Sequence, residues 1–151
     1  PVAAIRGYFN MSGGCDLSRF TAAQQSSYQT ALGEIRRGRK ISHWMWYIFP
    51  QVAGLGMSPT SQYYAISGLK EAEAYLDDPV LGPRLVEISN ALMNLDTSDA
   101  DDVFGWPDNM KLRSSMTLFS LVPSADPVFG KVLDKYFGGE PDDMTLRILG
   151  K

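Results

Sequence analysis

The chain has 151 residues, of which 44% are hydrophobic and 21% charged, a balance typical of one globular domain. Its formal net charge of −3 argues against a protein that binds a nucleic-acid backbone. No apolar run reaches the ~20 residues of a transmembrane helix. The single cysteine, Cys15, cannot form a disulfide within the chain, so we expect a cytoplasmic protein.

The first predicted helix begins at Asp16, a typical N-cap residue. Apolar residues then recur at three- and four-residue spacing until Gly38, a typical helix end. Ser42 predicts the cap of a short helix over HWMWYIF, which must end before Pro50. A buried strand is the alternative for this short apolar run.

Later helices carry similar start and stop signals. A cap followed by proline marks two starts, acidic residues mark others, and Gly105 and Gly138 mark ends. The predicted caps are Ser58, Ser67, Asp99, Asp108, Asp126 and Asp142, and a further helix begins at Pro79 or Pro83.

Nearly every apolar segment therefore has helical spacing, and the sequence holds no Asn-Gly or Asp-Gly hairpin signal. We expect a mainly α protein, with residues 16–151 forming one compact multihelical domain of about seven or eight short helices. Residues 1–15 are expected to form a flexible N-terminal extension.

The segment SHWMWYIF, residues 42–49, contains the only histidine and two of the three tryptophans. Helical spacing places Trp44 and Ile48 on one face, which we expect in the core. It places His43, Trp46 and Tyr47 on another face, which we expect to line a cleft for a planar anionic ligand. The rim of that cleft would be the basic cluster of Arg36, Arg37, Arg39 and Lys40. The alternative is core packing throughout, with His43 bonded to a backbone carbonyl.

A second candidate site is the segment from Asp108 to Thr117, which would begin a helix with two cations and two serines. Free amide groups at such a helix start attract phosphate or carboxylate. The ligand-binding candidates here are Lys111, Arg113, Ser114 and Ser115. Two alternatives stay open, an ordinary surface helix and a nucleophilic pair of Ser115 with Lys111.

Candidates for proton transfer and for further ligand contacts are scattered along the chain. His43 and Asp142 are the candidate catalytic residues, and Arg84 is a further candidate ligand-binding residue. The remaining acids that the fold could unite with them are Glu71, Glu140 and Asp143, for which a solvated helix face is the alternative. The sequence has no Walker loop, GxGxxG, HExxH or CxxC, so we expect neither a metal nor a cofactor.

Five blocks of the sequence carry a family resemblance. In order they are DLSRFTAAQ, GRKISHWMWYIFPQVAGLG, YAISGLKEAEAYLDDPVLGPRL, FGWPDNMKLRSSMTLF and FGGEPDDMTLRILG. Together they resemble the domain of unknown function 1810 family, sometimes labelled calpastatin. The resemblance spans nearly the whole chain, from Asp16 to Gly150. It implies a single, mainly α-helical domain of cytoplasmic type whose biochemical role is not established.

A fainter similarity links the chain to the NADAR (YbiA-like) proteins, which are associated with ADP-ribose and N-glycoside hydrolysis. The corresponding segments are residues 46–50, 66–75, 110–119 and 140–142. The chain carries DDMTLRILG where those proteins typically run from an acid to Trp-Gly. The similarity therefore does not imply that the chain shares the catalytic activity of those proteins.

Two functions are consistent with these patterns. One is the binding of a small nucleotide-like or ADP-ribose-like anion, with hydrolysis of that anion left open. Trp46 and Tyr47 would then stack on the ring while Lys111 and Arg113 hold the phosphate. The other is a non-enzymatic protein-interaction module or homodimer, formed through apolar helix faces. Whether the protein is an enzyme is left open by the sequence.

Overall fold

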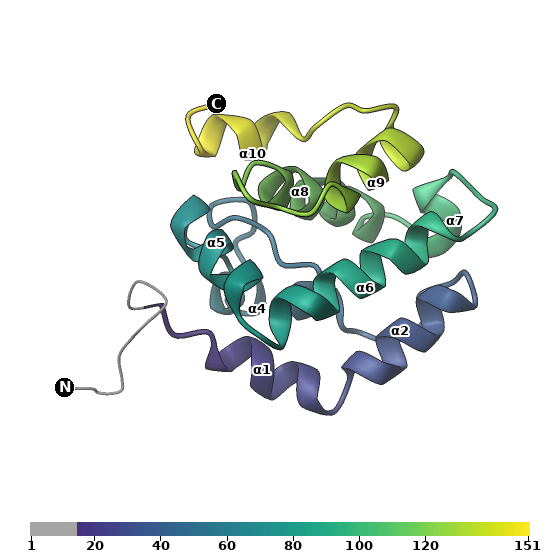
Figure 1. Ribbon diagram of the computed structural model, residues 1–151, viewed down its shortest axis with the longest axis horizontal. Coiled ribbons are helices and arrows are strands. Elements are labelled where there is room, and N and C mark those ends of the chain that lie inside the picture. Colours follow the sequence, from purple (N-terminus) through teal and green to yellow (C-terminus); the bar gives the residue numbers. More distant parts are fainter. Residues whose placement is uncertain (1–14) are drawn as a thin grey trace.

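Helices account for all the regular elements of residues 15–151, the part of the chain that the computed structural model describes (Figure 1). The ten helices of this range are α1 (Ser18–Gln25), α2 (Tyr28–Arg36), α3 (Met45–Ile48), α4 (Pro59–Tyr63), α5 (Leu69–Asp77), α6 (Leu81–Met93), α7 (Ala100–Phe104), α8 (Asp108–Ser120), α9 (Val128–Phe137) and α10 (Asp143–Ile148). The predicted mainly α class is confirmed, with more helices than the seven or eight expected. Apart from Cys15, the expected N-terminal extension lies outside the described residues.

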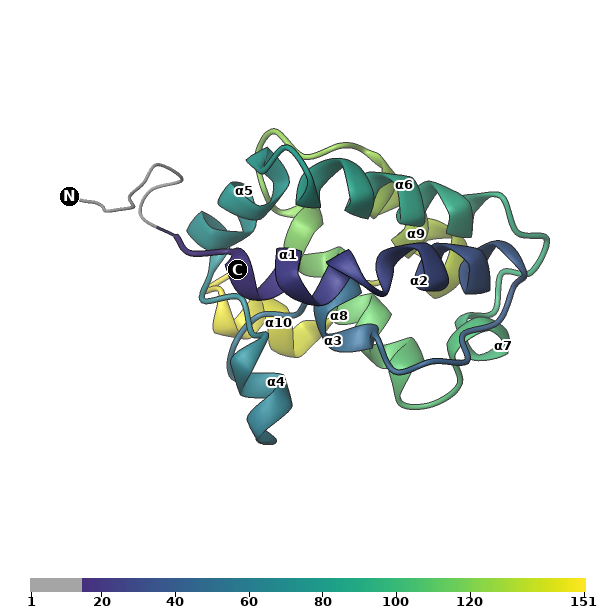
Figure 2. The same ribbon diagram turned by 90° about the horizontal axis from the view of Figure 1, so that it is seen from below.

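Helix α8 lies in the middle of the molecule in both ribbon views, with other helices around it (Figures 1 and 2). It packs against α5, α7, α9 and α10. Its side chains from Ser114 to Phe119 are all buried, as is Leu112. A helix buried on every side cannot show a one-sided apolar pattern, which explains why serines and a threonine occupy positions inside this core helix.

Several predicted helix signals are confirmed by hydrogen bonds. The side chains of Ser58, Asp99 and Asp142 each accept a bond from a backbone N–H in the first turn of α4, α7 and α10. Gly138 ends α9 with φ +61°, a left-handed conformation that glycine adopts without strain. These signals are local, so they can be recognised from the sequence.

The single first helix that the spacing predicts is wrong, because the chain breaks between α1 and α2. The Ser27 hydroxyl donates to the Ala23 carbonyl at 2.6 Å, and the Ser27 amide donates to the Gln24 carbonyl at 3.2 Å. Serine side chains that bond the backbone compete with helix continuation. The break lets α1 pack on α3 while α2 packs on α6.

Three predicted caps have other roles. The N-cap of α5 is Gly68, while the Ser67 amide donates to the Glu71 carboxylate. Ser42 donates to the Glu34 carboxylate, and α3 begins three residues later, at Met45. Asp108 is the first residue of α8, where its carboxylate binds two lysines. Ser42 binds a residue eight positions earlier, and Asp108 binds Lys40 from a separate segment as well as Lys111 three positions later. The strand alternative for residues 43–49 is also wrong, since α3 is helical, and the isolated bridge between Val52 and Ile66 lies just beyond it.

No helix within residues 15–151 combines the length and the apolar character that crossing a membrane requires.

Candidate functional site

The short helix α3 separates its aromatic residues into a buried and an accessible set. Trp44 and Ile48 keep 1% and 2% of their surface exposed, which confirms the predicted core face. Trp46 and Tyr47 are half-buried, and His43, just before the helix, is exposed. The predicted second face is therefore open to a ligand.

A buried carboxylate, that of Glu34 in α2, fixes the segment before α3. It accepts hydrogen bonds from the backbone amides of Ile41 and Ser42 at 2.7 and 2.9 Å and from the Ser42 hydroxyl at 2.6 Å. The Trp44 indole N–H donates a further bond at 2.9 Å. Burial acts to raise the pKa of Glu34, but these four bonds outweigh it and hold the pKa at about 2. The turn that carries His43 is thus held by an ionised group.

An open groove, here called the aromatic groove, runs between α3 and α4. Its lining residues are His43, Trp46, Tyr47, Pro59, Thr60, Tyr63 and Tyr64. The Tyr64 ring centroid lies 5.3 Å from that of Tyr47 and 4.8 Å from that of Tyr63, so the tyrosines support one another. Helix α4 lies at the edge of the molecule (Figure 2), which leaves the groove accessible.

Tyr47 is held in place by Gln24 of α1 and by Ser27, which lies in the break between α1 and α2. The Gln24 amide donates to the Tyr47 carbonyl at 2.8 Å, and the Ser27 and Tyr47 hydroxyls are hydrogen-bonded at 3.0 Å. A ring that is already ordered loses little entropy when a ligand stacks on it.

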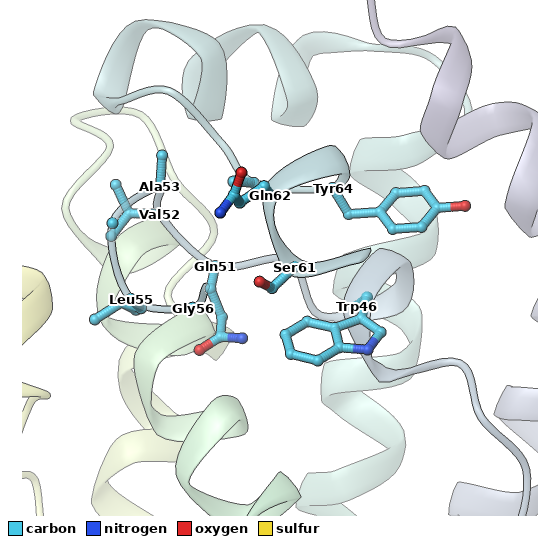
Figure 3. Close-up of a pocket in the computed structure, with 11 residues that line it drawn as sticks. Trp46, Gln51, Val52, Ala53, Leu55, Gly56, Ser61, Gln62 and Tyr64 are labelled. Atoms are coloured by element: carbon cyan, nitrogen blue, oxygen red, sulfur yellow. The ribbon is translucent and has the colours of Figure 1, made fainter. Parts of the chain in front are cut away.

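A smaller hollow, here called the glycine-loop pocket, adjoins the groove and shares Trp46 and Tyr64 with it. The remaining lining residues are Gln51, Val52, Ala53, Gly54, Leu55, Gly56, Ser61, Gln62 and Ala65. Its cavity of about 90 Å³ is too small to enclose a nucleotide, since pockets for such ligands typically measure ~300–1,000 Å³. In Figure 3 the Gln51 amide and the Ser61 hydroxyl lie beside the Trp46 indole.

Lys111 of α8 lies against Trp46, although Lys111 itself lines neither hollow. Its ammonium nitrogen lies 4.3 Å from the centroid of the Trp46 ring and 3.0 Å from Asp108 Oδ1, while the Lys40 ammonium lies 2.9 Å from Asp108 Oδ2. Partial burial acts to raise the pKa of Asp108, and the hydrogen bonds from both lysines outweigh it, so the pKa is lowered. Two cations share one carboxylate, which leaves a net positive charge beside Trp46.

The expected basic rim is wrong except for Lys40. Arg36 lies 3.9 Å from Glu87 in α6, an exposed ion pair, and lines a different surface hollow. The Arg37 guanidinium lies beside Gly33 of its own helix, and Arg39 is exposed. Lys40 reaches the site indirectly, through Asp108, because α2 faces α6 and leaves only the following turn near α8.

Two further arginines among the candidates lie outside the aromatic groove. The Arg84 guanidinium is 5.0 Å from the Tyr28 ring and 3.4 Å from Gln24 Oε1, so it contacts α1 and α2. Arg113 donates to the Glu140 carbonyl at 2.9 Å and lies over Phe137. Both guanidinium groups connect helices, and neither residue lines the groove or the glycine-loop pocket.

Ser114 and Ser115 of α8 are buried. Ser114 donates to the Met110 carbonyl at 3.2 Å, within its own helix. Ser115 is fully buried, and its hydroxyl has no hydrogen-bond partner among the described residues. Because the Lys111 ammonium is bound to Asp108, the structure does not assemble a Ser115–Lys111 pair. These serines pack the core where the sequence suggested a ligand site.

Asp142 caps α10. Its carboxylate accepts bonds from the Thr145 amide at 2.9 Å and the Thr145 hydroxyl at 2.6 Å. Asp142 lines neither hollow, so it is not brought to His43. Glu71 accepts bonds from the Ser67 amide and from Arg19. In the described range, no group of three His, Cys, Asp or Glu side chains is arranged to hold a metal ion.

Four polar or aromatic residues that line the two hollows were not predicted from the sequence. Tyr63 and Tyr64 lie in and after α4, and Gln51 and Ser61 line the glycine-loop pocket. The adjacent tyrosines behind the Ser58-Pro59 start signal were a usable clue, because a short helix exposes at least one of them. Gln51 lies in a loop, where no periodic pattern predicts which way its side chain points.

Comparisons with known proteins agree with this fold. Residues 14–149 match the family described as "Protein of unknown function (DUF1810)". The chain is 45% identical to the conserved hypothetical protein Rv1873 from Mycobacterium tuberculosis, whose crystal structure it matches with a TM-score of 0.87 over 90% of this chain and 97% of that one. No curated protein matches. These findings lend no support to the calpastatin label or to the NADAR similarity, and they show that the chain belongs to the DUF1810 family of proteins of unknown function.

Proposed function

We propose that the protein binds a small nucleotide-like anion, of which ADP-ribose is one representative, in the aromatic groove. The ligand ring stacks on Trp46 and the neighbouring tyrosines, and its phosphate lies near Lys111. One observation carries the proposal. The groove is lined by aromatic and imidazole side chains with no carboxylate among its described lining residues, while a lysine ammonium lies against its tryptophan.

The energetics favour a ligand with both a ring and a negative charge. Stacking a base on an aromatic side chain contributes about 1–3 kcal/mol, which alone gives weak binding. An ammonium has three donors, and Asp108 uses one of those of Lys111, so the others can bind a phosphate oxygen. One face of the Trp46 ring is covered by Lys111, and the ligand ring would use the other. An open groove of this kind predicts dissociation constants of roughly 10 μM to 1 mM.

The proposed function is ligand binding, and hydrolysis of the bound ligand would be an additional activity. Among the groove's described lining residues, His43 carries the side chain that enzymes use most often for proton transfer. Asp142, the other catalytic candidate, is engaged in capping α10. Hydrolysis would therefore rest on His43 alone, and a His43→Gln variant that binds the ligand without converting it would support that role.

Tryptophan fluorescence tests the proposal directly. Trp44 is buried and Trp106 is 79% exposed outside both hollows, so stacking in the groove should quench Trp46 selectively. We expect ADP-ribose and adenosine monophosphate to quench the wild-type protein and not the Trp46→Phe variant. Ribose 5-phosphate, which lacks a ring, should not quench either. Quenching that is equal in both proteins, or calorimetry that shows no binding by any of these compounds, would contradict the proposal.

Exposed apolar side chains favour a second candidate function, a protein-interaction module or homodimer. Ile41, Trp106 and Met110 are all exposed, and they flank the Lys40–Asp108 ion pair that joins their segments. Exposed apolar patches of this kind often mark interfaces. Light scattering distinguishes the candidates. A concentration-dependent dimer that an Ile41→Ser variant abolishes would support the second function.

A further inference from the structure

The Gln51 side chain is the one uncommitted amide of the glycine-loop pocket. The structure records no hydrogen bond to this side chain from any described residue, although the Gln51 carbonyl accepts one from the Ile66 amide at 2.8 Å. Gln62 also lines the pocket, but its amide donates to the Met57 carbonyl at 2.9 Å. In Figure 3 the Gln51 amide lies on the same side as the Trp46 ring, whereas Gln62 points away from it.

The other walls of the pocket are neutral. None of its described lining residues carries a charged side chain. The Ser61 hydroxyl donates to the Ser58 carbonyl at 2.8 Å, so it faces the pocket as an acceptor. Gly56 packs tightly here, because a Cβ at this position would lie 2.6 Å from Ser61 Oγ. A cavity of about 90 Å³ admits only the edge of a ring.

A glutamine amide presents a donor and an acceptor side by side in one plane. Its natural partner is a ring edge that carries the complementary acceptor and donor on neighbouring atoms, as in a nucleobase. We infer that Gln51 reads such an edge and thereby determines which ring the groove accepts. This inference rests on the proposed function, since it concerns the ring that stacks on Trp46.

The chemical class of ligand is therefore a nucleotide whose base has an amide-like or amidine-like edge. Adenine, hypoxanthine and uracil have one, whereas unsubstituted purine has no exocyclic donor beside its ring nitrogens. Because one bidentate pair discriminates by about 1–3 kcal/mol, the preference should be roughly tenfold.

Calorimetry with four probes tests the inference. We expect at least one of the 5′-monophosphates of adenosine, inosine and uridine to bind the wild-type protein about tenfold more tightly than purine riboside 5′-monophosphate. In Gln51→Leu that preference should vanish while binding that depends on Trp46 remains. Gln29→Leu, at an exposed glutamine of α2 outside both hollows, is the matched control and should keep the preference. Gln51→Ala serves as a second, smaller replacement, and thermal melts check that each variant is folded.

The outcomes separate the inference from the function on which it rests. Binding that Trp46→Phe weakens, without any preference or with a preference that survives in both Gln51 variants, overturns the role of Gln51 alone. Failure of all four probes to bind the wild-type protein overturns the nucleotide proposal together with this inference.

Discussion

The Lys111 ammonium lies 4.3 Å from the centroid of the Trp46 indole and 3.0 Å from Asp108 Oδ1. This contact connects α3 to the first turn of α8, and Asp108 also connects to Lys40 in the turn after α2. The Lys40 ammonium itself lies 5.1 Å from the centroid of the Trp44 ring, so Asp108 links two cations that contact two different tryptophans. The cation that contacts Trp46 therefore comes from α8, since neither α3 nor α4 contains one.

Replacing Lys111 by Gln should weaken the binding of nucleotide probes about five- to tenfold. The variant removes the positive charge that we expect to bind phosphate, and it leaves the stacking surface of Trp46 in place. Titration calorimetry at low and high salt measures the effect. The wild-type affinity should fall as salt rises, because partly exposed charges are screened, and the variant should respond less.

Lys131 provides the control for this prediction, because it is an exposed lysine of α9 outside both hollows. A Lys131→Gln variant changes the net charge by the same amount and should bind like the wild-type protein. Equal losses in the two variants would mean that overall charge, and no specific contact, attracts the ligand.

The two faces of α3 could be predicted because they follow from helical periodicity within a few residues. The burial of Trp44 and Ile48 and the accessibility of Trp46 needed no knowledge of the rest of the fold. The partners of the site were not predictable in the same way. Gln51 and Lys111 reach Trp46 only because the bridge between Val52 and Ile66 and the central position of α8 place them there.

Helix caps also divide into those that the local sequence predicts and those that depend on residues brought together by the fold. Asp142 bonds a residue three positions later, so the motif is complete in the sequence. Asp108 has an equally good local signal, but two lysines compete for its carboxylate. Charged partners bind a carboxylate more strongly than a backbone amide does. The sequence can suggest Lys111, three residues later, as a partner, whereas the contact with Lys40 depends on the fold.

Glu34→Gln should destabilise the protein by about 2–3 kcal/mol, a fall in melting temperature of roughly 5–10 °C. The buried carboxylate accepts four hydrogen bonds from residues 41–44, and an amide cannot accept them all. Thermal melts at pH 7 measure the change. Glu73→Gln, on an exposed position of α5, is the control and should melt like the wild-type protein.

The contribution of Glu34 should also depend on pH. Its pKa is about 2 in the folded protein, below the ordinary value of 4.5. A lowered pKa means that the stabilisation is complete above the unfolded-state pKa and is lost as pH falls from about 5 toward 2. The difference in melting temperature between the wild type and Glu34→Gln should therefore shrink over that range. A difference in melting temperature that stays constant from pH 7 to pH 3 would show that ionisation of Glu34 is not the source of the stabilisation.

Ser115→Ala should raise stability by about 0.5–1 kcal/mol. The Ser115 hydroxyl is fully buried without a partner among the described residues, so removing it relieves a desolvation cost. Thr117→Ala is the contrasting variant, because the Thr117 hydroxyl donates to the Arg113 carbonyl and accepts from the Asp142 amide, both at 2.8 Å. Denaturant unfolding should show opposite signs for the two. A large loss in Ser115→Ala would point instead to a bound partner for that hydroxyl.

Asp142→Ala should lower stability by about 1 kcal/mol, the usual effect of losing an N-cap, and leave ligand affinity unchanged. Among residues 15–151, the Asp142 carboxylate bonds only Thr145, and Asp142 lines neither hollow. Asp143→Ala is the matched control, since Asp143 is exposed in the first turn of α10 and does not cap it. Asp143→Ala should lower stability less than Asp142→Ala does, because it removes only a screened interaction with the helix dipole. Denaturant unfolding and calorimetry with ADP-ribose measure both quantities. If Asp142→Ala kept full stability but lost binding or turnover, Asp142 would be a site residue, and its proposed role as a structural cap would be wrong.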